Sequence, residues 1–269
     1  MNFQWLFDTP IAHRGVHDGS CPENSIPAYQ KAIEKGYSIE IDVHLTKDGR
    51  VVIFHDDNLK RVCGVDKLIK DCTLEELKTY RLCNTEYTIP TFDEFLKLID
   101  GQVGILCEIK GINPFDNSIV KAAIKCLEGY KGNIALQSFN FGAVKYARKH
   151  TSLPVGELCT WCSPDLKKMR WWPANFMGKM WICRITHPDF IAYDVRAVDS
   201  ALSENKYIIK WSKKLPIIMW TVNSEKTMED ALKYSNNIIF EDLPLEYVNE
   251  KVKGILPFRC LEKNLPCNK

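Results

Sequence analysis

Two carboxylates share one face of a short predicted strand. Glu40 and Asp42 alternate with branched apolar residues in the run 39–43. Successive side chains of a strand point to opposite faces, so both acids point one way and the apolar residues the other. In a barrel the apolar face packs against the helices and the acids face the interior near the mouth, where unpaired carboxylates are costly to desolvate. A bound cation would remove that cost.

A third carboxylate follows the same parity in a later run. Glu108 and Lys110 alternate with apolar residues, which places them together on an inward face at the end of the next barrel strand. Three hard oxygen ligands suit Mg²⁺ or Ca²⁺ better than zinc, so Glu40, Asp42 and Glu108 are candidate ligands of one divalent cation. The alternative is an ion-pair network in which Lys110 and Arg14 neutralise the three acids.

Two histidines follow predicted strands at the same rim. His13 comes directly after the first strand, and His55 comes after a hairpin strand. Histidine titrates near neutrality, so one member of such a pair can take a proton from a nucleophile while the other protonates a leaving oxygen. Arg14 adds a planar donor fork suited to phosphate, and Lys110 adds a point charge.

The charges of these groups favour a phosphodiester substrate. Three carboxylates with one divalent cation carry a net charge of about −1, and a phosphodiester adds another. Arg14 and Lys110 return two positive charges, so the assembled site is close to neutral. A carboxylic ester or a sugar would leave the positive charges without a partner, whereas a phosphodiester uses them in both the ground state and the transition state.

The elements that would position these residues alternate between strands and helices along the whole chain. We expect strands over 10–13, 38–44, 103–109, 133–138, 154–159, 190–195, 216–222 and 237–240. Eight such units predict an α/β fold, a closed TIM (β/α)8 barrel, with a doubly wound open sheet as the alternative. Helix starts are predicted at Ser25, Thr73 and Thr91, the last two with capping-box spacing.

One excursion interrupts the alternation after the second strand. The Gly49 turn predicts a hairpin that returns 51–54 antiparallel, and a small insertion follows over about 57–90. We expect a single barrel domain over 1–252 and a short C-terminal tail over 253–269.

Taken together, the motifs resemble those of the glycerophosphodiester phosphodiesterase family, in order and in spacing. They are His13-Arg14-Gly15, Pro22-Glu23-Asn24-Ser25, Glu40-Ile41-Asp42-Val43, Thr46-Lys47-Asp48-Gly49, His55-Asp56, Thr73-Leu74-Glu75-Glu76-Leu77, Ile89-Pro90-Thr91-Phe92, Glu108-Ile109-Lys110, Gln137-Ser138-Phe139 and Trp220-Thr221-Val222-Asn223. The similarity covers nearly all of 7–250.

The resemblance implies a TIM barrel that hydrolyses glycerophosphodiesters, a small-molecule substrate class, to glycerol 3-phosphate and an alcohol with a divalent metal. Carried over by motif, Glu40, Asp42 and Glu108 would be the metal ligands. His13 and His55 would be the acid–base pair, and Arg14 and Lys110 would bind the phosphate. Trp220 resembles the family's aromatic residue at the seventh strand, a candidate contact for the glycerol or head group, with packing in the core as the alternative.

Two alternatives to hydrolysis remain open at this stage. The first is a related phospholipase D-like or phosphoinositide-type lyase that stops at a cyclic phosphate. The second is a phosphodiester-binding protein without turnover, because the loop 17–21 and the run 237–242 depart from the usual pattern of the family. The altered loops also leave the head-group preference open.

The composition limits partners and location. Lysines and arginines number 36 against 34 acids, and a net charge of +2 is too small and too evenly spread for a nucleic-acid-binding protein. No apolar stretch approaches the length needed to cross a bilayer, and the N-terminus lacks the features of a signal peptide. With 11 scattered cysteines, an odd number, we expect reduced thiols and a cytoplasmic protein.

Two other features receive no functional assignment. The aromatic and basic residues of 161–181 could rest on an anionic membrane surface, but Pro173 interrupts the helical pattern, and packing on the barrel is favoured. Cys159 and Cys162 have the CxxC spacing of a zinc or redox site without a second pair, which disfavours either role.

Overall fold

The computed structural model describes residues 3–111, 113–160, 176–198 and 206–253. The chain divides into two compact units, which we call the 11–155 unit (Ile11–Val155) and the 156–269 unit (Met1–Pro10 with Gly156–Lys269). Apart from Lys253, the predicted C-terminal tail lies outside the described residues, and so does most of the Trp-rich segment.

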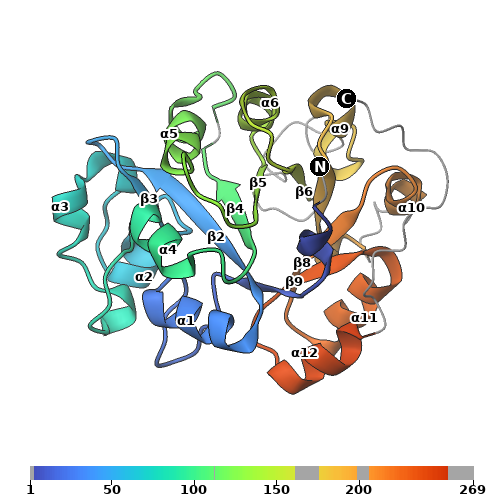
Figure 1. The fold of residues 1–269 in the computed structure, drawn as a ribbon, viewed down its shortest axis with the longest axis horizontal. Coiled ribbons are helices and arrows are strands. Elements are labelled where there is room, and N and C mark those ends of the chain that lie inside the picture. Colours follow the sequence, from blue (N-terminus) through green and yellow to red (C-terminus); the bar gives the residue numbers. More distant parts are fainter. Residues whose placement is uncertain (1–2, 112, 161–175, 199–205, 254–269) are drawn as a thin grey trace. The chain divides into compact units, whose positions relative to one another are not determined.

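The 11–155 unit contains four parallel strands in the order β1-β2-β4-β5, with β3 antiparallel to β2 (Figure 1). Its elements are β1 (Ile11–His13), α1 (Ile26–Lys35), β2 (Ser38–Leu45), β3 (Val51–Ile53), α2 (Lys60–Cys63), the 3-10 turn Ile69–Asp71, α3 (Leu74–Leu77), the 3-10 turn Leu82–Asn84, α4 (Phe92–Ile99), β4 (Ile105–Ile109), α5 (Ser118–Cys126), β5 (Ile134–Ser138) and α6 (Phe141–His150).

The 156–269 unit contains the remaining parallel strands in the order β6-β7-β8-β9. Its elements are the 3-10 turn Gln4–Phe7, β6 (Val155–Cys159), α9 (Cys183–Thr186), β7 (Phe190–Asp194), the 3-10 turn Val195–Ala197, α10 (Lys206–Ser212), β8 (Ile217–Val222), α11 (Glu225–Tyr234), β9 (Asn237–Phe240) and α12 (Leu245–Val252). The Asn237 side chain donates to the backbone oxygens of Leu6 and Thr9, both at 2.7 Å, which ties the N-terminal segment to β9.

In the described parts of the chain, eight parallel strands with helices between them, and one further strand outside the ring, make the fold a TIM (β/α)8 barrel with an insertion after the second strand. The predicted fold class is therefore confirmed, and the open sheet is not formed. Each of the eight predicted strands overlaps an observed one, with ends that differ by two residues at most.

The helix starts follow from their capping residues. Ser25 accepts a hydrogen bond from the Ala28 N–H at the start of α1, and Thr91 with Glu94 forms a complete capping box at the start of α4. Thr73 accepts a hydrogen bond from the Glu76 N–H at the start of α3. These side chains satisfy N–H groups that have no partner inside the helix.

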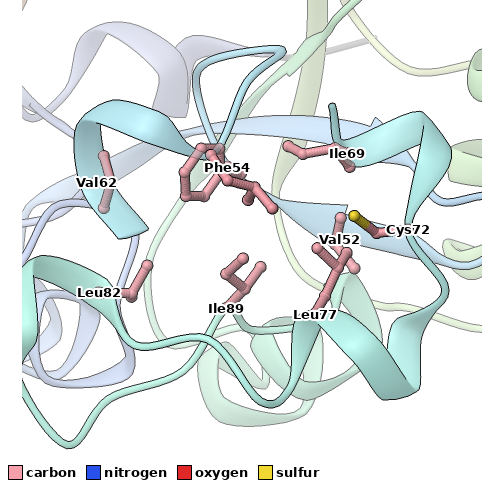
Figure 2. Close-up of a cluster of buried hydrophobic side chains, with 9 residues drawn as sticks. Val52, Phe54, Val62, Ile69, Cys72, Leu77, Leu82 and Ile89 are labelled. Atoms are coloured by element: carbon pink, nitrogen blue, oxygen red, sulfur yellow. The ribbon is translucent and has the colours of Figure 1, made fainter. Parts of the chain in front are cut away.

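The insertion has a small hydrophobic core of its own (Figure 2). Side chains from β3, from the short helices after it and from the segments that connect them pack together in that cluster: Val52, Phe54, Leu59, Val62, Ile69, Cys72, Leu77, Leu82 and Ile89. Burial of this apolar surface compensates for the shortness of the helices, which would not be stable alone. The insertion is thus anchored to β3 and, through β3, to β2.

Within the part of the chain that the structure describes, no helix combines the length and the apolar character that a membrane crossing requires.

Candidate active site

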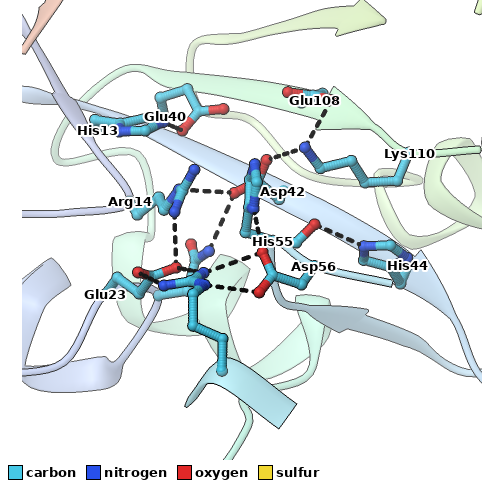
Figure 3. A network of polar contacts seen from close by, with 12 residues as sticks. His13, Arg14, Glu23, Glu40, Asp42, His44, His55, Asp56, Glu108 and Lys110 are labelled. Atoms are coloured by element: carbon cyan, nitrogen blue, oxygen red, sulfur yellow. Dashed lines mark hydrogen bonds and ion pairs between the residues drawn. The ribbon is translucent and has the colours of Figure 1, made fainter. Parts of the chain in front are cut away.

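The register of neighbouring strands brings the three predicted acids together. Asp42 on β2 is paired in register with Glu108 on β4, and Glu40 lies two residues earlier on the same face of β2. One ligand atom of each carboxylate lies within 4.8 Å of the others. Figure 3 shows Glu40 on one side of Asp42 and Glu108 on the other. The parity argument from the sequence therefore places the carboxylates correctly.

The two predicted cations both pair with Asp42. The Lys110 ammonium lies 2.7 Å from Asp42 Oδ1 and 2.8 Å from Glu108 Oε1, so it bridges these two acids. Arg14 Nε lies 3.4 Å from Asp42 Oδ2. Glu40 is the acid that these cations leave least neutralised: its Oε2 is buried and accepts no hydrogen bond.

The three acids differ in their protonation equilibria because of these contacts. Burial, followed by the charges of Asp42 and Glu108, raises the pKa of Glu40 well above its usual value. Burial and the nearby Asp42 charge also raise the pKa of Glu108, against the effect of Lys110. Burial alone would raise the pKa of Asp42, but Lys110, His55 and Arg14 outweigh it and lower that pKa.

This donor set is compatible with a divalent cation. Three carboxylates converge, and Glu40 Oε2 lies buried without a hydrogen bond. Burial and then the charges of Asp42 and Glu108 raise the pKa of Glu40, and a cation would offset both causes. Glu40, Asp42 and Glu108 are the residues that could hold the ion. The ion-pair network that we considered as the alternative accounts for Asp42 and Glu108, but it leaves Glu40 Oε2 unsatisfied.

A tight turn after β1 places His13 and Arg14 beside Glu40. The Arg14 N–H donates to the Glu40 carbonyl at 3.0 Å, and its backbone has a φ of 58°. Gly15 follows with a φ of 86°, and a Cβ there would lie 2.9 Å from the Ala28 backbone. Only glycine fits so close an approach between this turn and α1. His13 Nε2 then lies 3.9 Å from Glu40 Oε2.

His55 is oriented by the acid that follows it. Its Nδ1 lies 2.6 Å from Asp56 Oδ1. The hydrogen bond from His55 and the contacts with Arg61 outweigh burial and lower the pKa of Asp56, so this carboxylate is ionised and can only accept. Nδ1 of His55 therefore carries the proton of that hydrogen bond. Nε2 is left as the nitrogen available for proton transfer.

Four neighbours of the site received no role from the sequence, although three of them lie in motifs that we quoted. Asn24 donates to Asp42 Oδ2 at 3.1 Å and accepts from the Tyr29 hydroxyl at 3.1 Å. Glu23 accepts from Arg14 at 2.8 Å. Asp56 and Arg61 complete the set, and the Arg61 guanidinium donates to Asp56.

Several predictions fall outside this group of residues. Trp220 lies on β8 in the 156–269 unit, so its contact with substrate stays a prediction. Cys162 lies outside the described residues, as does 161–175 of the Trp-rich segment. His44 is buried, and its Nε2 lies 3.2 Å from the His55 carbonyl oxygen.

Three carboxylates, two cations and two histidines at the ends of TIM-barrel strands are the groups that a phosphoryl-transfer enzyme needs to bind a cation and a phosphate and to move protons. Comparison with known protein families identifies one family in that class. The glycerophosphoryl diester phosphodiesterase family matches residues 13–246, and the chain belongs to this family.

Individual relatives agree with this assignment. The chain is 30% identical over 250 residues to a glycerophosphodiester phosphodiesterase of Bacillus altitudinis, covering 87% of this chain and 94% of that one. It is 30% identical over 262 residues to one of Caldanaerobacter subterraneus subsp. tengcongensis, covering 91% and 98%. Among solved structures, an Oleispira antarctica phosphodiesterase in complex with the product sn-glycerol-3-phosphate matches the fold with a TM-score of 0.72 and 22% identity, over 92% of this chain and 98% of that one.

Proposed function

We propose that this protein hydrolyses glycerophosphodiesters to glycerol 3-phosphate and an alcohol, with the reaction centred on Glu40, Asp42 and Glu108. The convergence of these three carboxylates with Lys110 and Arg14 carries the proposal. Two relatives named glycerophosphodiester phosphodiesterase support the reaction class. The product bound by the Oleispira antarctica phosphodiesterase supports a small glycerophosphodiester as the ligand.

Arg14 and Lys110 bind the phosphate in this proposal. Both are nearly buried, with side chains 13% and 14% exposed, so their charges act in a medium that screens them less than water does. The Arg14 fork suits two oxygens of a phosphate, and the Lys110 ammonium supplies a point charge. Both cations also stabilise the additional negative charge of the transition state.

His13 and His55 move the protons. One accepts the proton of the nucleophile, and the other donates a proton to the departing oxygen. For His55 the structure favours Nε2 as the working nitrogen, because Nδ1 is bonded to Asp56. The nucleophile is either water or the neighbouring glycerol hydroxyl. In the second route a cyclic phosphate forms first and water then opens it.

We propose that Glu40, Asp42 and Glu108 hold one divalent cation, Mg²⁺ or Ca²⁺. Carboxylate oxygens are the preferred ligands of both ions, and substrate or water oxygens complete the coordination. When bound, the cation supplies Lewis-acid stabilisation of charge on the phosphate oxygens.

A substrate panel tests the proposed reaction. Glycerophosphocholine, glycerophosphoethanolamine, glycerophosphoglycerol and glycerophosphoinositol are each assayed for glycerol 3-phosphate, with Mg²⁺, with Ca²⁺ and with chelator. We expect release that depends on metal. Accumulation of a cyclic phosphate without glycerol 3-phosphate would identify a lyase, and tight binding without release would identify a binding protein.

We also propose a cytoplasmic location. Eleven cysteines are present, and buried ones among the described residues, such as Cys21, Cys72 and Cys107, are free thiols, as a reducing compartment favours.

A further inference from the structure

Arg61 stands at the centre of a chain of hydrogen bonds in the 11–155 unit. It lies on α2 of the insertion, far along the chain from most of the residues discussed above. Its guanidinium donates to Glu23 from Nη1 at 2.6 Å and from Nη2 at 2.8 Å. It donates to Asp56 from Nε at 2.7 Å and from Nη2 at 3.1 Å. One side chain thus holds two carboxylates, each through two hydrogen bonds.

Each of these carboxylates also holds a residue of the proposed machinery. Glu23 accepts from Arg14 Nη1 at 2.8 Å, and Asp56 accepts from His55 Nδ1 at 2.6 Å. Figure 3 shows Glu23 beside Arg14 and Asp56 beside His55. The residue that binds phosphate and one of the residues that transfers a proton are therefore connected through Arg61.

We propose that Arg61 is a positioning residue, which fixes Arg14 through Glu23 and His55 through Asp56 for the same reaction. The inference rests on the proposed function and adds the insertion to the active site. Without Arg61, the two anionic side chains that share its Nη2 donor would lose the positive charge that lies between them. Their repulsion would move both partners, and displacement of a reacting group by about 1 Å can cost about 100-fold in rate.

The geometry requires an arginine. The planar fork of a guanidinium presents donors in fixed directions, so it can hold two carboxylates at once. A lysine ammonium keeps the charge, but it is a point donor and cannot make both bidentate contacts. The Arg61 side chain is 48% exposed, so charge alone would be strongly screened by solvent. Orientation is therefore the larger part of its effect.

Kinetics with glycerophosphocholine separate the connection to Arg14 through Glu23 from the connection to His55 through Asp56. We expect Arg61→Met to lower kcat/KM about 10- to 100-fold, with a rise in KM from the loosened Arg14 and a fall in kcat from the misplaced His55. Glu23→Gln should mainly raise KM, and Asp56→Asn should mainly lower kcat. The double variant Arg61→Met/Asp56→Asn should lose less kcat than the product of the two single losses, because both changes break the connection to His55.

Two further variants distinguish positioning from general support of the insertion. Lys60→Ala is the matched control, because Lys60 is the neighbour of Arg61 on α2 and its ammonium lies 3.3 Å from the exposed carboxylate of Asp66. It should leave kcat and KM unchanged. Arg61→Lys should fold like the wild type and still fail to restore kcat/KM. A purely structural role would lower the active fraction, and hence kcat, without raising KM.

A second measurement does not depend on turnover. We expect Arg61→Met and Arg61→Lys to weaken the binding of inorganic phosphate, measured by calorimetry. They should also shift or remove the proton NMR signal of His55 Nδ1–H, while Lys60→Ala changes neither.

If the wild type is active and Arg61→Lys keeps the wild-type kcat and KM, the inference is overturned. It is also overturned if both Arg61 variants keep the phosphate affinity and the His55 signal of the wild type. A wild type that releases no glycerol 3-phosphate from any substrate would instead refute the proposed function. The phosphate and NMR measurements would then still decide the role of Arg61.

Discussion

Replacing Glu40 by glutamine should make the metal-free protein more stable while it removes function. The Glu40 carboxylate is buried within 4.8 Å of two others. At an effective dielectric constant of about 20, each like-charge contact at that distance costs about 3.5 kcal/mol. Protonation of Glu40 costs less free energy than two such contacts. From an ordinary pKa of 4.5, protonation at pH 7 costs about 3.4 kcal/mol, which caps the penalty. We expect Glu40→Gln to recover about 1–3 kcal/mol of it.

Thermal unfolding with chelator, with Mg²⁺ and with Ca²⁺ measures this effect. For a chain of this size about 1 kcal/mol shifts Tm by roughly 2–4 °C, so Glu40→Gln should melt about 2–12 °C above the wild type in chelator. The wild type should gain stability when metal is added, and the variant should gain little. Glu34→Gln, an exposed site on α1, carries the same change of charge and should do neither. A Glu40→Gln protein that melts below the wild type in chelator, or that keeps the full metal-induced shift, would refute this reasoning.

Three further outcomes follow from other parts of the molecule. His13→Ala and His55→Ala should each lower kcat/KM by about 100- to 10,000-fold with an unchanged circular dichroism spectrum, and substantial retained activity in either would disprove its acid–base role. Burial raises the pKa of Glu157 to about 8, above its value in the unfolded chain. The wild type should therefore lose stability as the pH rises from about 4.5 towards 8, whereas Glu157→Gln should lose less. Urea midpoints at pH 5 and pH 8 check this, and equal losses in both proteins would contradict it. Phe54→Ala should destabilise the insertion by about 3–5 kcal/mol, and a cost below about 1 kcal/mol in urea unfolding would show that the cluster contributes little.

The strands and the acids on them could be predicted because both depend on short-range patterns. The alternation of Glu40 and Asp42 with apolar residues fixes which face each side chain takes once one face is buried. The expected run 38–44 is observed as Ser38–Leu45. Strand register then brings Glu108 opposite Asp42, as the barrel hypothesis required.

The hydrogen bonds of Arg61 could not be predicted in this way. Glu23 and Arg61 are 38 positions apart, and their contact depends on the path of the insertion, which no periodicity encodes. Arg61 follows Lys60 on a helix of four residues, a pattern that resembles an ordinary solvated surface. Asp56 adjoins His55 in the sequence, so their contact was easier to predict than the contact between Glu23 and Arg61. His44 is buried although it is polar, because its imidazole is hydrogen-bonded to the backbone carbonyl of His55.

The Lys110 ammonium between Asp42 and Glu108 has a consequence for the order of events during biosynthesis. A polypeptide that had to bury three anions without a counter-charge would fold at a high cost in free energy until an ion was bound. Here the polypeptide brings its own counterion, and burial together with the neighbouring acids raises the pKa of the remaining acid, Glu40, which favours its protonated form. Maturation can then proceed in two stages, with closure of the barrel first and loading of the ion afterwards by exchange for that proton.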